Sequence, residues 1–263
     1  MGEEFKDIVL HQMRKDMMVK TFKTGQRFDG RKLDELRPLE IQKGNIHTAE
    51  ASSLVKLGLT QVLVGIKFDV LTPFADRPEE GVIMSNAELS PVASSTFETG
   101  PPDENSIELA RIVDRGIRSA ECVDLKSLFI EEGKVLAVFI DIYALNHAGN
   151  LVDAASIAAI AALTDAKMPK IENGKIVRGE FTGKLPLSSL PVAVTSIKCS
   201  DYWLTDPSFE EEYIKESKIT IATTDKHVCA IQKGKGAMTR KELDNAIEIA
   251  FKRGDDIRNI LKH

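Results

Sequence analysis

Residues 153–167 form the segment that most restricts how this chain can fold. The segment is rich in alanine and is apolar on nearly every side of a helix. A helix that is hydrophobic all round has to be enclosed by other elements of the protein. Its longest apolar stretch, residues 157–163, is much shorter than the roughly 20 residues that a membrane-spanning helix needs. We therefore expect a central buried helix and no contact with a membrane.

Segments with strand patterns lie on both sides of this helix in the sequence. Residues 51–70 contain two runs rich in β-branched residues with Gly58 between them, which predicts a β-hairpin. Apolar segments with partial alternation predict further strands at residues 82–89, 135–145, 191–198, 218–223 and 227–232.

Three more helices are predicted. A helix over residues 106–122 is predicted because Asn105 and Glu108 stand at capping-box spacing at its start. Another helix is predicted from residue 240 to the end, where apolar residues form one side. A leading amphipathic helix over residues 4–22 is predicted from apolar residues at near-helical spacing: Ile8, Val9, Met13, Met17 and Val19. Runs of strands followed by a helix occur twice, which indicates an α+β fold.

The chain divides at a segment rich in Gly, Lys and Ser. Residues 173–189 have this composition and contain Pro186, so we interpret them as a linker between two units. The expected organisation is an amino-terminal helix over residues 1–26, a first unit over 27–185 and a smaller second unit over 186–263.

Composition narrows the functional classes only slightly. In 263 residues, 43% are hydrophobic and 29% are charged, as in ordinary globular domains. The amino terminus opens with acidic residues and has no apolar signal core, so we expect a cytoplasmic chain. The net charge of −5 gives no overall attraction to nucleic acid, and any such contact has to come from a local basic cluster. Three separated cysteines, Cys122, Cys199 and Cys229, suit buried thiols better than disulfides or a metal clip.

The familiar enzyme motifs are absent from the sequence. There is no Walker loop, dinucleotide glycine fingerprint, H-E-x-x-H or G-x-S-x-G pattern. The five histidines never occur at i, i+4 spacing, and we expect no metal and no cofactor. Residues 233–236, Lys-Gly-Lys-Gly, look like a phosphate loop, but their order favours the end of a hairpin before a helix.

One predicted helix carries an arginine pattern. Arg111, Arg115 and Arg118 follow at i, i+4 and i+7, so their side chains project from one face. The planar guanidinium donates two parallel hydrogen bonds to phosphate oxygens, which suits nucleic-acid binding. The alternative is a solvated face in which Glu108 pairs with Arg111 and Asp114 pairs with Arg118. Periodicity alone leaves both interpretations open.

Several short motifs occur together along the chain. They are Arg27-Phe28-Asp29-Gly30-Arg31, Arg37-Pro38, Gly-Leu-Thr-Gln-Val at 58–62, Gly-Pro-Pro-Asp-Glu-Asn at 100–105 with Ile-Glu-Leu-Ala-Arg at 107–111, the run at 147–154, and Gly-Lys-Leu-Pro-Leu at 183–187. In this combination they resemble the RNase PH family, and in particular the non-catalytic RNase PH-like subunits of the archaeal exosome ring. The resemblance covers nearly the whole chain.

The resemblance implies an RNase PH-like fold made of two β-α-β-β-α-type units. It implies a hexameric ring in which this chain alternates with a catalytic RNase PH-like subunit as a trimer of heterodimers, capped by RNA-binding subunits. Single-stranded RNA would enter the central channel, and inorganic phosphate would attack the 3′-terminal phosphodiester. The family places the arginine helix near the junction with the catalytic neighbour, so RNA contacts are expected at Arg111 and Arg115, with Arg118 as a further candidate.

Departures from the catalytic members indicate a non-catalytic subunit. Catalytic relatives carry Gly-Ser-Arg at the start of the Ala-rich helix, where this chain has Ala148, Gly149 and Asn150. Asp153 is expected to occupy the helix amides that phosphate would otherwise use. Paired arginines of the relatives are replaced by Glu104-Asn105. Losing one Arg about 4 Å from phosphate removes about 4 kcal/mol at an effective dielectric of about 20.

Two other functions stay open from the sequence. The chain would be a phosphate-dependent 3′-to-5′ exoribonuclease in its own right if Asp206 and the acids at 210–212 formed an active site, with or without a magnesium ion. It would be an unrelated small-molecule enzyme if the fold had been adapted to other chemistry, because a fold does not fix a function.

Overall fold

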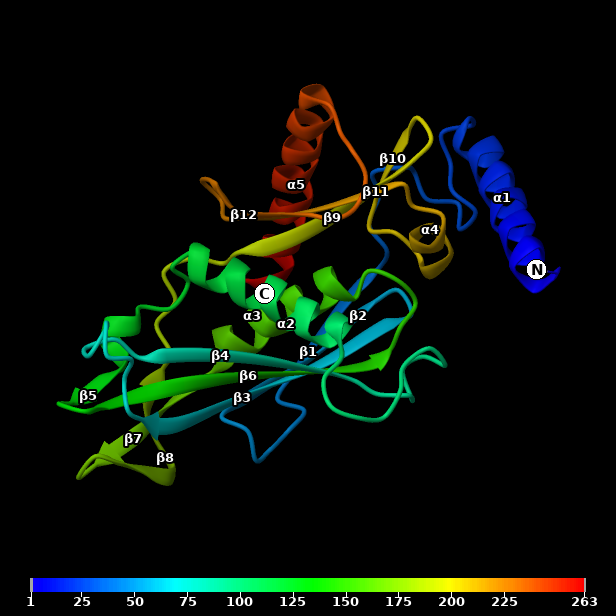
Figure 1. Ribbon diagram of the computed structural model, residues 1–263. Helices are drawn as coiled ribbons and strands as arrows, with labels where there is room; N and C mark the ends of the chain where they lie inside the picture. The colour runs from blue at the N-terminus through cyan, green and yellow to red at the C-terminus, as the bar shows by residue number, and fades with distance from the viewer. Residues whose placement is uncertain (1, 263) are drawn as a thin grey trace.

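The protein is built from four layers, in the order sheet, helices, sheet, helix (Figure 1). The computed structural model describes the backbone of residues 2–262 and the side chains of residues 10–262. Helices α2 and α3 lie between a six-stranded and a four-stranded sheet, and α5 covers the outer face of the smaller sheet. The α+β class expected from the sequence is confirmed.

The larger sheet consists mainly of antiparallel strands. Its order is β1-β2-β3-β6-β4, with β5 paired to β6, and β4 runs parallel to β6. The predicted hairpin is present, and Leu57 pairs with Thr60 across a turn that contains Gly58. The strands span Leu39–Lys43 (β1), Ala51–Leu57 (β2), Thr60–Leu71 (β3), Val82–Leu89 (β4), Phe129–Glu131 (β5) and Lys134–Asn146 (β6).

The smaller sheet is antiparallel, in the order β10-β9-β11-β12. Three of its strands lie within one residue of the predicted bounds. Strand β10 was not predicted, because four residues are too few to show a period. The strands span Val192–Cys199 (β9), Tyr202–Thr205 (β10), Ser217–Thr223 (β11) and Val228–Lys233 (β12).

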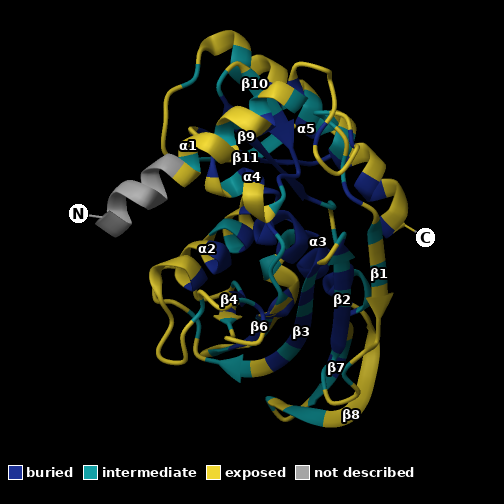
Figure 2. Ribbon diagram, turned by 90° about the vertical axis from the view of Figure 1, so that its right-hand side faces the viewer, coloured by how far each residue is buried: buried dark blue, intermediate teal, exposed yellow. Residues whose placement is uncertain are grey.

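Helix α3 (Leu151–Asp165) is the centre of the core. It packs against β2 and β3 on one side and against β9 on the other, and it is buried along almost its whole length (Figure 2). The enclosure predicted from its all-apolar surface is therefore confirmed. The other helical elements are α1 (Gly2–Phe22), α2 (Glu104–Ser119), the 3-10 turn Leu125–Leu128, the short α4 (Phe209–Tyr213) and α5 (Arg240–Leu261).

Helix α2 begins earlier than predicted. Its N-cap is Asp103, whose carboxylate accepts a 2.8 Å hydrogen bond from the amide of Ser106. Asn105 is therefore inside the first turn, and the capping box expected from Asn105 and Glu108 is wrong. Asp103 is the stronger cap because its charged side chain also interacts with the positive end of the helix dipole.

Most of the segment interpreted as a linker forms a hairpin. Strand β7 (Lys167–Glu172) pairs with β8 (Lys175–Lys184) across a two-residue turn made by Asn173 and Gly174. Both turn residues have positive φ, 52° and 68°. An Asn-Gly pair favours this turn because both residues tolerate the left-handed region, and it is a strong sequence signal for a hairpin.

Helix α1 buries only part of the apolar side that was predicted, and Val19 from that side packs against the second unit. Met18 and Phe22 are buried against Ile197, Leu204 and Ile214 of the second unit. Met13 and Met17, which were expected on the apolar side, are exposed. The side chains of Ile8 and Val9 lie outside the described residues. Of the cysteines, Cys122 and Cys199 are buried and Cys229 is half-buried.

Candidate functional site

A buried ion pair joins the amino-terminal segment to the second sheet. Asp206 follows β10 and is fully buried, with its backbone in the left-handed region at φ 52°. Arg37, just before β1, donates from Nε to Oδ2 at 2.9 Å and from Nη2 to Oδ1 at 2.7 Å. The Arg37 guanidinium also reaches the carbonyls of Ala148 and Gly149 at 3.0 and 3.2 Å. One arginine thus connects β1, the start of α3 and the end of β10.

Two further buried arginines surround this pair. Arg27 is paired with Glu211 of α4 through two hydrogen bonds, and it also donates to the carbonyls of residues 205 and 206. Arg31 donates to Asp206 Oδ2 at 3.3 Å and to Asp29 Oδ2 at 2.7 Å. Two carboxylates of the acidic segment, Asp206 and Glu211, are therefore engaged by arginines inside the protein.

The start of α3 is closed by neighbouring backbone. Gly149 has a φ of 97°, and a Cβ there would lie 2.4 Å from the carbonyl carbon of Ser208. The amide of Phe209 donates to the carbonyl of Ala148 at 3.1 Å. Asn150 at the N-cap points inward, and its Nδ2 donates to Asp206 Oδ1 at 2.7 Å.

Asp153 does not bind the helix amides as expected. Its carboxylate accepts from the amide and hydroxyl of Thr195 on β9 at 2.8 and 2.7 Å, and from Nδ2 of Asn150 at 2.7 Å. The first turn of α3 lies against the smaller sheet, so the side chain faces β9. Burial raises the pKa of Asp153 to about 7, although the hydrogen bonds oppose this change.

All three arginines singled out on α2 are exposed, but their guanidinium groups do not form one stripe. Arg118 donates to Asp114 Oδ2 at 2.6 Å and to the carbonyl of Ile83 on β4. Arg115 turns the other way, and its Nη1 donates to Oε1 of Gln232 on β12 at 2.7 Å. Arg111 makes no hydrogen bond or ion pair with any described residue. The predicted Asp114–Arg118 pair is present, whereas none is formed between Glu108 and Arg111 within the described part of the chain.

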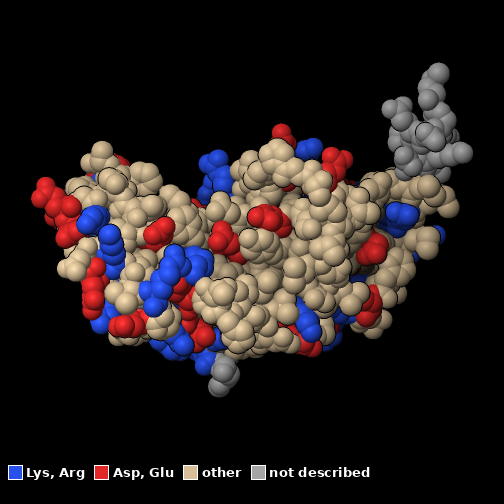
Figure 3. Space-filling view, turned by 90° about the horizontal axis from the view of Figure 1, so that it is seen from below, with Lys and Arg blue, Asp and Glu red and all other residues tan. Residues whose placement is uncertain are grey.

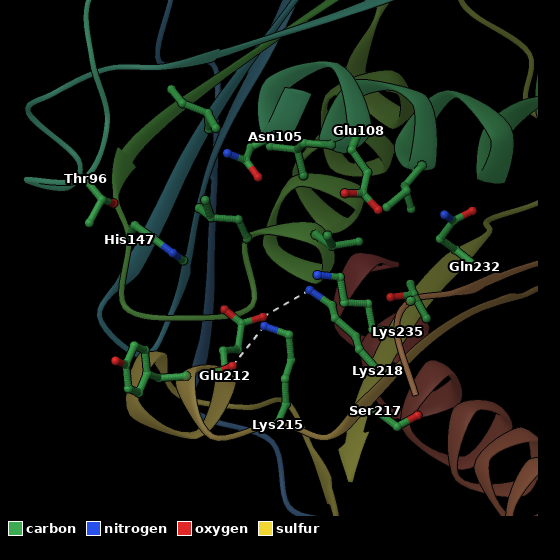
Figure 4. Close-up of a pocket in the computed structure, with 18 of the residues that line it drawn as sticks. Thr96, Asn105, Glu108, His147, Glu212, Lys215, Ser217, Lys218, Gln232 and Lys235 are labelled. Atoms are coloured by element: carbon green, nitrogen blue, oxygen red, sulfur yellow. Dashed lines mark hydrogen bonds and ion pairs between the residues drawn. The ribbon is translucent and has the colours of Figure 1, made fainter. Parts of the chain in front are cut away.

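A cavity of about 710 Å³ opens beside α2, between the starts of α2 and α3 and the strands of the smaller sheet. Asn105 and Glu108 lie on its α2 side, and His147 lies at the end near α3 (Figure 4). Lys215, Lys218 and Lys235 line the opposite side. Lys215 and Lys218 were not identified from the sequence, because they lie in an ordinary polar turn and strand.

Residues 233–236 form the predicted hairpin end. Strand β12 ends at Lys233, and α5 begins at Arg240. The ammonium group of Lys233 donates to the carbonyls of residues 234, 235 and 236, which fixes the loop. Lys235 is thereby placed at the cavity.

The described side chains contain no cluster of His, Cys, Asp and Glu that could hold a metal ion. None of the helices, taken over the residues that are described, is long and apolar enough to cross a membrane. Viewed from the side of the larger sheet, basic and acidic residues are interspersed (Figure 3). On this face, any attraction for a polyanion must therefore come from a few local cations.

The four layers, with two sheets sharing one core around α3, define the class of protein: an RNase PH-like α+β chain. Two domains of the 3′ exoribonuclease (RNase PH) family match, domain 1 at residues 35–169 and domain 2 at residues 189–253. The chain belongs to this family.

Relatives of known identity are similar over nearly the full length. The exosome complex component Rrp42 of Pyrococcus abyssi is 46% identical over 262 residues, which cover 97% of this chain and 95% of the relative. A chain from the solved Archaeoglobus fulgidus exosome with RNA bound to the active site has a TM-score of 0.87 at 45% identity, covering 95% of this chain and 98% of that chain. A chain of an archaeal exosome core has a TM-score of 0.86 at 43% identity, with coverage of 98% and 100%.

Replacing Asp206 with Asn should destabilise the protein strongly. The amide keeps the size of the side chain but leaves Arg37 buried without its counter-charge, which typically costs about 3–5 kcal/mol. Urea unfolding should show a loss of free energy in that range. Asp225→Asn, at an exposed position, is the matched control and should change stability by less than about 0.5 kcal/mol. Equal stability of the two variants would contradict the assigned role of Asp206.

The raised pKa of Asp153 predicts a pH-dependent stability. Between the ordinary carboxyl pKa near 4 and about 7, the folded protein keeps a proton that the unfolded chain has lost. The free energy of unfolding should therefore fall as pH rises through this window, by roughly 3 kcal/mol between pH 5 and 8. Asp153→Asn should remove this contribution, because the amide is neutral throughout. Parallel stability profiles of wild type and variant over pH 5–8 would show that Asp153 titrates normally.

Proposed function

We propose that this chain is a non-catalytic subunit of a cytoplasmic exosome ring that degrades RNA in the 3′-to-5′ direction. In this proposal it alternates with a catalytic RNase PH-like subunit in a hexamer, carries RNA-binding cap subunits, and helps to form its neighbour's active site. The names of its relatives, which are exosome components, support this assignment. We retain the division at residues 1–26, 27–185 and 186–263, since the two matched family domains fall inside the second and third parts.

The observation that carries the non-catalytic assignment is the engagement of Asp206. Its two oxygens accept hydrogen bonds from Arg31, Arg37 and Asn150, and its side chain is fully buried. A general acid needs access to the leaving group, and a metal ligand needs a free lone pair that faces the metal ion. Asp206 has neither, which disfavours the alternative of an independent phosphorolytic enzyme.

The start of α3 supports the same conclusion. At residues 148–150 there is no hydroxyl or cation, and the backbone of residues 207–209 packs directly on Gly149. A phosphate held by a helix start needs exposed amides and positive charge. Here Asn150 carries no charge, and its side chain points inward to Asp153 and Asp206.

For RNA we propose contacts through Arg111 and Arg115. Both side chains are exposed on α2, and Arg111 has its full donor set free within the described residues. Arg118 is the weaker candidate, because its guanidinium is already held by Asp114 and the carbonyl of Ile83. Phosphate contacts of this kind contribute affinity without reading sequence.

The proposed division of labour predicts a reconstitution result. Release of nucleoside diphosphate from poly(A), with phosphate and magnesium, should be undetectable for this chain alone and maximal for its mixture with the catalytic subunit. The catalytic subunit alone should be less active, since its site would lack the neighbouring surface. Phosphorolysis by the purified chain alone would refute the non-catalytic assignment.

Charge reversal on α2 should weaken RNA binding by the assembled ring. Arg115→Glu replaces one phosphate contact with repulsion, so the affinity for single-stranded RNA should fall about tenfold and the salt slope of log K should decrease by about 1. Fluorescence anisotropy at several salt concentrations measures both. Arg178→Glu, exposed on the distant β8, is the matched control. Unchanged binding by the Arg115 variant would exclude α2 from the RNA path.

A further inference from the structure

Helix α1 lies at the edge of the molecule, next to α4 (Figure 1, Figure 2). It buries Met18 and Phe22 in a small apolar cluster with side chains of the second unit, among them Ile214 after α4. This cluster is separate from the main core around α3. Helix α1 can therefore detach from the second unit while the main core stays closed.

Polar side chains of α1 reach one short segment of the second unit, the turn at residues 213–216. The ammonium group of Lys15 forms an ion pair with Glu216. Nε2 of His11 donates to the backbone carbonyl of Tyr213 at 3.2 Å, and the guanidinium of Arg14 lies 6.0 Å from the centre of the Tyr213 ring. The turn at 213–216 is thus held by α1 through an ion pair, a hydrogen bond and an aromatic contact.

The two ends of α4 are restrained in different ways. At its start, the amide of Phe209 donates to the carbonyl of Ala148, and Glu211 is paired with the buried Arg27. At its end, the turn at 213–216 contacts α1 and is joined to β9 by one backbone hydrogen bond, from the amide of Glu216 to residue 198 at 2.8 Å. The start of α4 is therefore fixed from inside the protein, whereas its end depends on α1.

We propose that α1 is a detachable strap that holds the turn at 213–216, so that the strap and the turn open together while the main core and the start of α4 stay in place. The turn forms one side of the cavity beside α2, since Tyr213, Lys215 and Glu216 line it. The strap therefore sets how far the cavity is open on this side. Most of the stability of a helix in a protein comes from its packing, so α1 loses its own backbone hydrogen bonds when it detaches.

Hydrogen exchange of the full-length chain tests the proposal through Met18→Ala. This substitution removes a buried side chain from the cluster under α1 and should favour the detached state. We expect amide exchange to become at least about tenfold faster in α1 and faster by a similar factor at residues 213–216, with α3 unchanged. Met13→Ala is the matched control, since it makes the same change on the exposed side of the same helix, and it should exchange as wild type does.

Two milder variants test the coupling through the polar contacts. Lys15→Gln removes the ion pair but keeps the apolar cluster, so exchange in α1 and at 213–216 should rise about twofold to fivefold. Lys20→Gln, exposed on the same helix, is its control. Coupling between two sites is reciprocal, so Tyr213→Ala should speed exchange in α1, whereas Tyr143→Ala, exposed on β6, should not.

The distribution of the faster amides decides between the outcomes. Faster exchange confined to α1 would show that the turn is held without it, and the strap assignment would be wrong. Faster exchange in α3 by the same factor, or a Met18→Ala chain that does not fold, would show that α1 belongs to the main cooperative unit and does not detach. Lys15→Gln gives the same decision in a folded chain.

The inference goes beyond the proposed ring function and does not require it, because exchange is measured on the isolated chain. Reconstitution of RNA degradation can therefore fail while the strap and the turn open together. In the same way, independent opening of the turn would overturn the strap and leave the ring function untouched.

Discussion

The ion pair between Arg37 and Asp206 is the interaction on which the arrangement of this protein depends. It joins the segment before β1, the start of α3 and the end of β10, which lie far apart in the sequence. Buried pairs of this kind add little net stability relative to apolar residues, but breaking one leaves an uncompensated charge. The pair therefore fixes how the two sheets meet around α3 more than it raises the free energy of unfolding. Arg27 and Glu211 extend the same restraint to α4.

This restraint has a functional consequence. A carboxylate that is held by two arginines and an amide has its charge and lone pairs committed to the fold. Asp206, which could have supplied an acid near the start of α3, instead holds the two units together. The backbone of residues 207–209, which follows Asp206 directly, packs over Gly149. The segment at residues 206–209 therefore both joins the two units and covers the start of α3. A change in this segment affects both.

The sequence predicts the parts of this structure that have local signatures. An all-apolar helix must be enclosed, and the enclosing strands show their own patterns, so α3 and most strands of both sheets were predictable. The β7–β8 hairpin was missed although Asn173-Gly174 signals it, because its composition looked like a linker. The contacts of Arg27 and Arg37 with Glu211 and Asp206 connect residues more than 160 positions apart, and no local pattern predicts such partners. Lys215 and Lys218 meet Lys235 at the cavity only when α4, β11 and the loop after β12 come together, and so these two were missed for the same reason.

Helix α2 connects the proposed RNA surface to the cavity. Arg111 is exposed, whereas Arg115 donates to Gln232, a residue that also lines the cavity. At the proposed RNA surface, a phosphate that binds Arg115 has to compete for its guanidinium with Oε1 of Gln232, which accepts at 2.7 Å. Arg111 has no such connection among the described residues. The two arginines lie on adjacent turns of one helix, yet under the proposed function a phosphate at Arg115 replaces a side-chain contact, whereas a phosphate at Arg111 adds one.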